Sequence, residues 1–160
     1  MVIFDIDSSL ADSVHRPELE RMLSKKEHII SWMQNVIGSY HCKIGIVQYI
    51  FCNDAYLLGI NRQFLDHDYY TDIITFDYSN VNIFDSSCTN TTVQGDIFVS
   101  IDTIFTNAKQ FSHSFKDELL RVLIHGLLHL IGQKDKTETD ATEMQHKENQ
   151  ALSIINDYNL

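Results

Sequence analysis

The sequence is poor in several residue types, and each shortage narrows the class of protein. Its three cysteines, Cys42, Cys52 and Cys88, are odd in number and form no CxxC pair, so neither a disulfide framework nor a cysteine zinc knuckle is indicated. This usage fits a reducing cytoplasm. No apolar run reaches the length that spans a bilayer, and no basic region precedes the apolar residues of the opening segment. We therefore expect neither export nor a membrane-embedded segment.

Basic residues are also scarce. Twelve lysines and arginines stand against 22 aspartates and glutamates, and the formal net charge is -10. Such a balance argues against a large basic surface for nucleic acid. A polynucleotide substrate would then need a local positive field, which a metal ion in a cleft supplies. The acidity by itself is equally consistent with a role in solubility.

At 160 residues the chain has the size of one domain, and we expect no linker. Hydrophobic periodicity and turn residues predict strands at 2–6, 43–51, 72–77 and 96–99, and helices at 18–37, 54–64, 102–111, 115–131 and 138–156. Asn53 and Thr137 are expected to cap helices, and 78–94 to form a long exposed hairpin connection. The prediction is a small mixed α/β (α+β) domain of about four strands. The strongly apolar helix at 115–131 should be central and buried.

That helix carries the segment that says most about chemistry. His125 and His129 are four residues apart, so they project from one face of a helix and can bind one metal ion together. Gly132 can end the helix in a left-handed conformation, and Asp135 follows where a third ligand is needed. Three protein ligands leave a fourth tetrahedral position for water, as in catalytic zinc sites. The alternative is that the histidines are buried and bonded to core carbonyls.

The residue after the first histidine limits the reaction class. Zinc proteases of the HExxH kind carry their general base there, whereas this chain has Gly126. Nucleobase deaminases need a PCxxC pair, which this chain lacks. Neither mechanism is therefore expected.

Several blocks of the sequence resemble, in order and spacing, the signature of the YbeY family of endoribonucleases. The matching blocks are Ile60-Asn61, TDIITF at 71–76, Gly95-Asp96-Ile97, Glu118, and HGLLHLIG at 125–132. The resemblance covers nearly the whole chain. It implies one zincin-like metal-dependent hydrolase domain over residues 1–160, holding one zinc ion through His125, His129 and Asp135. It also implies cleavage of single-stranded RNA in 16S rRNA maturation and ribosome quality control, with the small ribosomal subunit as a partner, in the cytoplasm.

Two positions depart from the family pattern. The family's third histidine falls at Asp135, a harder ligand that tolerates other divalent ions than zinc. The family's usual arginine falls at Leu65. We expect Arg121, one turn before His125, to replace that arginine at the phosphate, with Arg62 as the second candidate. The alternative is a surface ion pair, for instance of Arg121 with Asp117.

The resemblance also gives Glu118 a place at the site. It lies two turns before His125, so it is better suited to contact substrate or to support the ligands than to act as a base. A metal-bound hydroxide or the RNA 2′-hydroxyl could attack the phosphodiester. Aromatic residues between Tyr69 and Tyr78 could stack bases or pack in a core.

Two other functions stay open on the sequence. The acidic charge favours a metal-dependent hydrolase of a non-nucleic-acid substrate. Leu65 favours a ribosome-associated factor with weak or vestigial catalysis.

Overall fold

A four-stranded mixed sheet forms the centre of the protein. The computed structural model describes residues 1–79 and 91–160, so most of the predicted connection at 78–94 and Cys88 lie outside the described residues. The strands are β1 (Val2–Ile6), β2 (Cys42–Cys52), β3 (Ile73–Asp77) and β4 (Thr91–Ser100), and their order in the sheet is β1-β2-β4-β3. β1, β2 and β4 are parallel, whereas β3 pairs with β4 in the antiparallel direction. The predicted α+β class and four strands are confirmed, and β3 is an edge strand.

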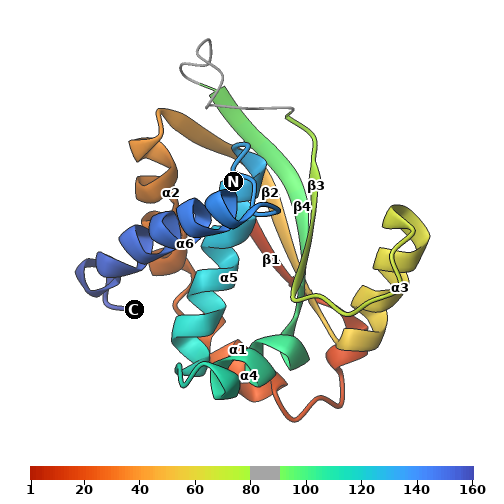
Figure 1. The fold of residues 1–160 in the computed structure, drawn as a ribbon. Coiled ribbons are helices and arrows are strands. Elements are labelled where there is room, and N and C mark those ends of the chain that lie inside the picture. The colour runs from red at the N-terminus through yellow and green to blue at the C-terminus, as the bar shows by residue number, and fades with distance from the viewer. Residues whose placement is uncertain (80–90) are drawn as a thin grey trace.

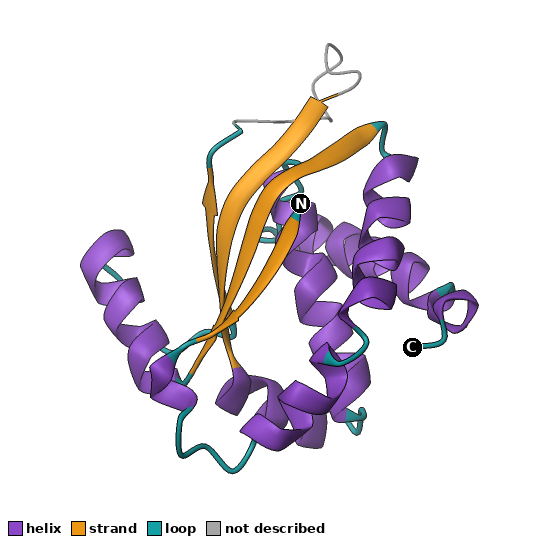
Figure 2. Cartoon of the chain, turned by 180° about the vertical axis from the view of Figure 1, so that it is seen from behind, coloured by secondary structure: helices purple, strands orange, loops and turns teal. Residues whose placement is uncertain are grey.

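The helices lie on both sides of this sheet. Their bounds are α1 (Arg16–Leu23), α2 (Lys26–Ser39), α3 (Asp54–Leu65), α4 (Ile101–Gln110), α5 (Phe115–Leu130) and α6 (Glu138–Ser153), with short 3-10 turns at Ser8–Leu10 and Ile155–Tyr158. Figures 1 and 2 show α3 on one side of the sheet and α2, α5 and α6 on the other. The sheet therefore has two faces that are covered by different elements.

Local capping chemistry sets several helix starts as predicted. The side chain of Asn53 accepts a hydrogen bond from the Tyr56 N–H, and Thr137 accepts one from the Asp140 N–H. Ser114 caps α5 in the same way through the Asp117 N–H. These caps satisfy backbone donors that have no partner inside the helix.

The single helix predicted over 18–37 is wrong, because the chain forms α1 and α2 with a break at Ser24 and Lys25. The Ser24 hydroxyl donates to the Arg21 carbonyl at 2.7 Å, a local bond that competes with helix continuation. The Lys25 ammonium donates to the Asn159 carbonyl. The break thus includes a contact with a residue 134 positions away in sequence, which periodicity cannot indicate.

The main core lies between the sheet and α5, α2 and α6. As predicted, α5 is central, and the side chains of Leu119, Leu123, Leu127 and Leu128 are fully buried. An ideal Cβ on Gly126 would lie 2.8 Å from Ile73 Cδ1 and 3.1 Å from Ile97 Cγ2, so a glycine allows α5 to approach β3 and β4 closely. This approach places the C-terminal end of α5 beside the edge strand.

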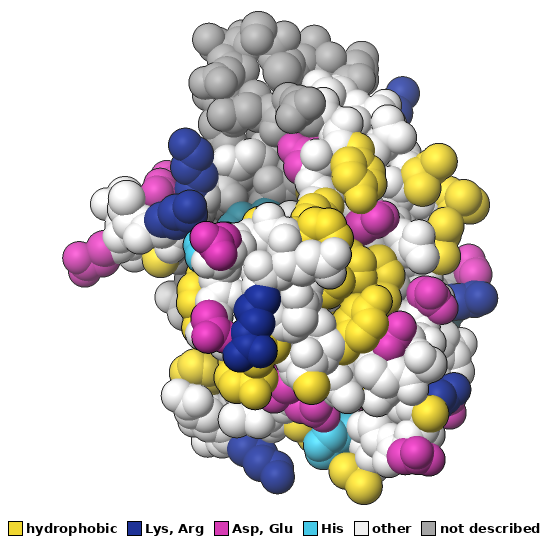
Figure 3. Space-filling view, turned by 90° about the vertical axis from the view of Figure 1, so that its right-hand side faces the viewer, with side chains coloured by type: hydrophobic (Ala, Val, Ile, Leu, Met, Phe, Trp, Pro, Cys, Tyr) yellow, Lys and Arg dark blue, Asp and Glu magenta, His cyan; other side chains and the backbone are white. Residues whose placement is uncertain are grey.

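The opposite face holds a smaller core of Cys52, Leu57 and Ile74 under α3. Rings continue outward from it: Tyr56 stacks on Phe98, and Phe76 meets both Phe98 and Phe64 edge to face. Figure 3 views this side and shows hydrophobic side chains running across its surface. The Phe64 side chain is 57% exposed. Within residues 1–79 and 91–160, no helix has the length and apolar character needed to cross a bilayer.

Candidate metal centre

The end of α5 and the turn after it bring the three predicted ligands together. His125 and His129 lie in the last two turns of α5, and Gly132 takes a positive φ of 99° immediately after the helix. The Gly132 N–H donates to the His129 carbonyl and the Gln133 N–H to the Leu128 carbonyl, each at 2.9 Å. This closed turn reverses the chain and carries Asp135 back over the histidines, as the sequence predicted.

The distances among the three side chains fit one small cation. Asp135 Oδ2 lies 3.6 Å from His125 Nε2 and 3.4 Å from His129 Nε2, and all three ligand atoms lie within 4.8 Å of one another. Tetrahedral zinc with bonds of about 2.0–2.1 Å places its ligand atoms about 3.3 Å apart. The side chains could therefore accept a metal ion with little movement.

The second nitrogen of each ring is already held by an acceptor. His125 Nδ1 donates to Glu148 Oε1 at 2.7 Å, and His129 Nδ1 donates to the Gln133 carbonyl at 2.8 Å. A carboxylate and a carbonyl can only accept, so Nδ1 carries the proton in both rings. In its neutral form each ring presents the lone pair of Nε2 toward Asp135. Such a bond behind a histidine fixes its orientation at a metal.

Opposing effects set the pKa values in this cluster. Burial acts to lower the pKa of His125, but the hydrogen bond and charge of Glu148, with Asp72 and Asp135, raise it above its ordinary value. Burial and the charge of His125 lower the pKa of His129. Burial acts to raise the pKa of Glu148, but His125 and Arg121 lower it below its ordinary value. Glu148 is therefore an anion behind the ligands.

Arg121 lies on the far side of Glu148 from the ligands. Its guanidinium donates to Glu148 Oε2 at 2.9 Å and to Asn149 Oδ1 at 3.0 Å. The ion pair of Arg121 is therefore with Glu148 and not with Asp117, whose carboxylate accepts from the Ser114 hydroxyl. The chain Arg121–Glu148–His125 joins α5 and α6 behind the site.

Glu118 is also separate from the ligand cluster. Its side chain is buried and lies 3.1 Å from His113 Nδ1. Arg62, the other candidate for the missing arginine, pairs with Asp68 on the exposed segment after α3. The catalytic roles assigned to Arg121 and Glu118 stay predictions.

Glu148, whose carboxylate contacts the candidate ligand His125, is a residue that the sequence alone did not single out. Met144, Glu148 and Ala151 are buried along one face of α6. A charged residue at a buried helical position needs a partner, so its place in this pattern was the available signal. The pattern does not indicate which residue is the partner, because that residue lies 23 positions earlier in the chain.

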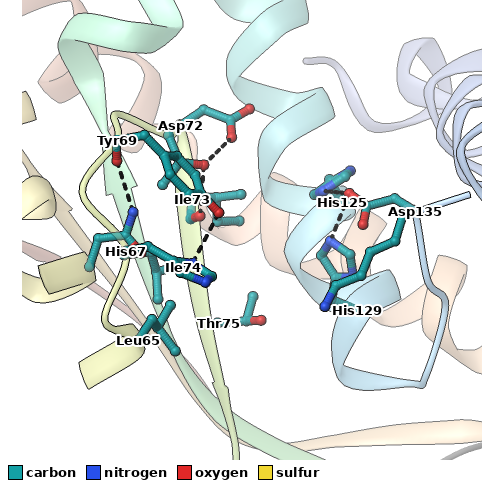
Figure 4. Close-up of a pocket in the computed structure, with 13 residues that line it drawn as sticks. Leu65, His67, Tyr69, Asp72, Ile73, Ile74, Thr75, His125, His129 and Asp135 are labelled. Carbon is teal, nitrogen blue, oxygen red and sulfur yellow. Dashed lines mark hydrogen bonds and ion pairs between the residues drawn. The ribbon is translucent and has the colours of Figure 1, made fainter.

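A cleft opens from the ligands toward β3 and the segment after α3. It has a volume of about 390 Å³, and Figure 4 shows His125, His129 and Asp135 on one side with Asp72 to Thr75 on the other. Leu65, His67, Tyr69 and Lys136 also line it. The ring of Tyr69 stacks on His67 with centroids 5.1 Å apart, and its side chain is 57% exposed.

Comparison with known proteins shows the family to which this sequence is similar. A family model described as "Endoribonuclease YbeY" matches residues 13–156. The protein of that name from Bacteroides thetaiotaomicron is 48% identical over 130 residues, which is 81% of this chain and 88% of the relative. That from Cytophaga hutchinsonii is 45% identical over 139 residues, 87% of this chain and 92% of the relative. The solution structure of TM1509 from Thermotoga maritima has a similar fold, with a TM-score of 0.62, 22% identity, and coverage of 97% of this chain and 89% of that one.

Proposed function

The chain belongs to the endoribonuclease YbeY family, and on that premise we propose that it is a metal-dependent endoribonuclease specific for single-stranded RNA. Residues 1–160 would act as one hydrolase domain. The observation that supports the metal dependence is the convergence of two Nε2 atoms and one carboxylate oxygen on one wall of the cleft. By the family resemblance, its substrate is the 16S rRNA precursor on the small ribosomal subunit, in the cytoplasm.

We infer that the resident metal is one zinc ion, held by His125, His129 and Asp135. Two imidazoles and a carboxylate form an acceptable zinc set, although the carboxylate also suits harder divalent ions. When bound, zinc lowers the pKa of a coordinated water to about 7 and so supplies hydroxide near neutral pH.

The residues around the ligands would position the two histidine rings and would not themselves react with the substrate. Glu148 holds the His125 ring, and the Gln133 carbonyl holds the His129 ring, so neither nitrogen ligand needs to turn when it binds. Arg121 acts through Glu148 as a positioning residue, because its guanidinium is engaged on the side away from the cleft. Glu118, bonded to His113, supports the same helix two turns earlier.

The far wall of the cleft would receive the RNA. Asp72 lies close enough to affect the pKa of both histidines, so its carboxylate could accept a proton during the reaction. The exposed Tyr69 ring offers a face on which an unpaired base can stack. Bases in a duplex already stack on one another, so this contact favours single strands.

The test compares metal content and RNA cleavage in the same preparations. We expect about one equivalent of zinc by elemental analysis, cleavage of a single-stranded oligoribonucleotide but not of its duplex, and loss of cleavage on chelation. His129→Ala should lose both metal and cleavage. His28→Ala, an exposed histidine on α2, is the matched control and should keep both.

The remaining outcomes select another function. Metal without RNA cleavage, together with hydrolysis of another substrate, would support the non-nucleic-acid hydrolase. Metal without cleavage, but with binding to small ribosomal subunits, would support a ribosome-associated factor. Absence of metal from the wild-type protein, with no gain on adding zinc, would contradict the proposal.

A further inference from the structure

Cleavage of a phosphodiester builds negative charge on the phosphoryl oxygens. Enzymes stabilise this charge with cations or oriented donors placed where it develops. In this protein a single metal ion would supply part of that field, but Asp135 replaces what could be a neutral ligand with an anion. The site therefore holds less positive charge than one with three histidines, and a further cation near the metal would offset the difference.

None of the four arginines is placed to contact a phosphate bound at the proposed metal site. Each pairs with a carboxylate of its own neighbourhood: Arg16 with Glu20, Arg21 with Glu18, Arg62 with Asp68, and Arg121 with Glu148. Of these four side chains, Arg121 lies nearest the ligands, and its guanidinium is held behind them. Among the arginines and lysines, a cation for the substrate must therefore come from the lysines.

Two lysines flank the carboxylate ligand. Lys136 lines the same cleft as His125, His129 and Asp72, and Lys134 lines the adjoining recess with His129 and Thr75. Both side chains are exposed. Within residues 1–79 and 91–160, neither ammonium group is paired with a carboxylate.

The backbone that carries these lysines is held in place. Gln133 is buried, and its amide donates to the Lys134 carbonyl at 2.9 Å. Its side-chain oxygen accepts from the Lys147 ammonium of α6 at 2.6 Å. The segment is thus fixed at its base while the two lysine side chains stay available, which lowers the entropy cost of binding an anion between them.

We propose that Lys136 binds the scissile phosphate beside the metal ligands, and that Lys134 binds a neighbouring phosphate of the same strand. The inference rests on the proposed function and deepens it, since it names the cations that recognise the RNA backbone. Lysine binds phosphate as a point charge, so it tolerates the variety of phosphate orientations in a single strand better than a bidentate group would.

The experiment measures cleavage, metal content and oligonucleotide binding for Lys136→Gln, Lys134→Gln, Lys136→Arg and the control Lys109→Gln. Lys109 is exposed on α4, which lies at the other end of α5 from the ligands (Figure 1). Its replacement by glutamine removes one positive charge, as the replacement of Lys136 does. We expect Lys136→Gln to lower kcat/KM by about 10- to 100-fold while metal content stays unchanged, because one charge-assisted contact contributes about 1.5–3 kcal/mol. Lys136→Arg should retain most of the activity.

Lys134→Gln should mainly raise KM, and it should reduce the dependence of log Kd on log salt by about 0.7, the value for one phosphate of a single strand. Binding is measured with a 2′-O-methyl oligoribonucleotide, which reports on phosphate contacts even without cleavage. If Lys136→Gln cleaves and binds as Lys109→Gln does, the lysine inference is wrong although the enzyme stands. If the wild-type protein cleaves no RNA but the lysine variants lose binding, the proposed function is wrong although the lysine site stands.

Discussion

The two faces of the sheet differ in how tightly they are packed, and the difference separates two parts of the cleft. The face under α5 is a continuous core in which α5, β3 and β4 approach closely at Gly95 and Gly126. The face under α3 has a small core of three buried residues and a row of partly exposed rings. The proposed metal ligands belong to the tightly packed side, whereas Leu65, His67 and Tyr69 lie at or just after the end of α3 on the thinly packed side. Rigidity is thus concentrated where ligand geometry matters.

The largest expected effect is on the free energy of unfolding, when one glycine on each face of the sheet is replaced by alanine. An ideal Cβ at Gly95 would clash with the Phe76 carbonyl oxygen and lie 2.9 Å from Leu130 Cδ2, so Gly95→Ala must move β3 or α5. We expect it to lower the free energy of unfolding by about 2–3 kcal/mol. Gly59→Ala, in α3 with nothing within 4 Å, should instead raise it by about 0.5–1 kcal/mol through helix propensity. Urea denaturation measures both, and equal effects would remove the contrast between the faces.

A second prediction concerns the buried anion behind the ligands. Glu148→Gln keeps the shape of the side chain but removes the charge that orients and polarises His125. We expect zinc affinity to fall about 10- to 100-fold, measured by competition with a chelator. Glu143→Gln, at an exposed position of α6, should leave the affinity unchanged. A merely structural role for Glu148 would lower stability without changing the affinity of the folded protein for zinc.

The smallest expected effect concerns Cys52, in the small core under α3. Burial, with the negative charges of Asp7, Asp54 and Asp102, raises the pKa of Cys52 to about 12. Because the folded state holds this proton more tightly than the unfolded state, its contribution to stability is lost as pH rises from about 9 toward 12. Only the thiolate reacts with iodoacetamide, so we expect labelling of Cys52 at pH 8 to be at least about 10-fold slower in the native protein than in urea. Equal rates, read by mass spectrometry, would mean that the face under α3 opens readily.

Local patterns predicted much of this molecule, and long-range contacts account for the rest. The caps at Asn53 and Thr137 and the four-residue spacing of His125 and His129 are written within one or two turns of chain. The contact of Lys25 with Asn159 at the break after α1, and the pairing of Glu148 with His125, join residues far apart in sequence. β4 begins at Thr91 and not near 96, because its pairing with β2 continues through Thr91 to Val93. Propensity in a short window carries no information on such partners.

The positions of the proposed metal ligands along the chain have a consequence for how such a protein can change. His125, His129 and Asp135 lie within eleven consecutive residues, on one helix and the turn that follows it. The opposing wall comes from a separate stretch between Asn61 and Thr75. Under the proposed function, metal affinity and substrate preference therefore depend on different segments of the chain. Substitutions in the second stretch can alter which molecules are accepted while the first keeps its metal, so a new specificity can arise without passing through a metal-free form.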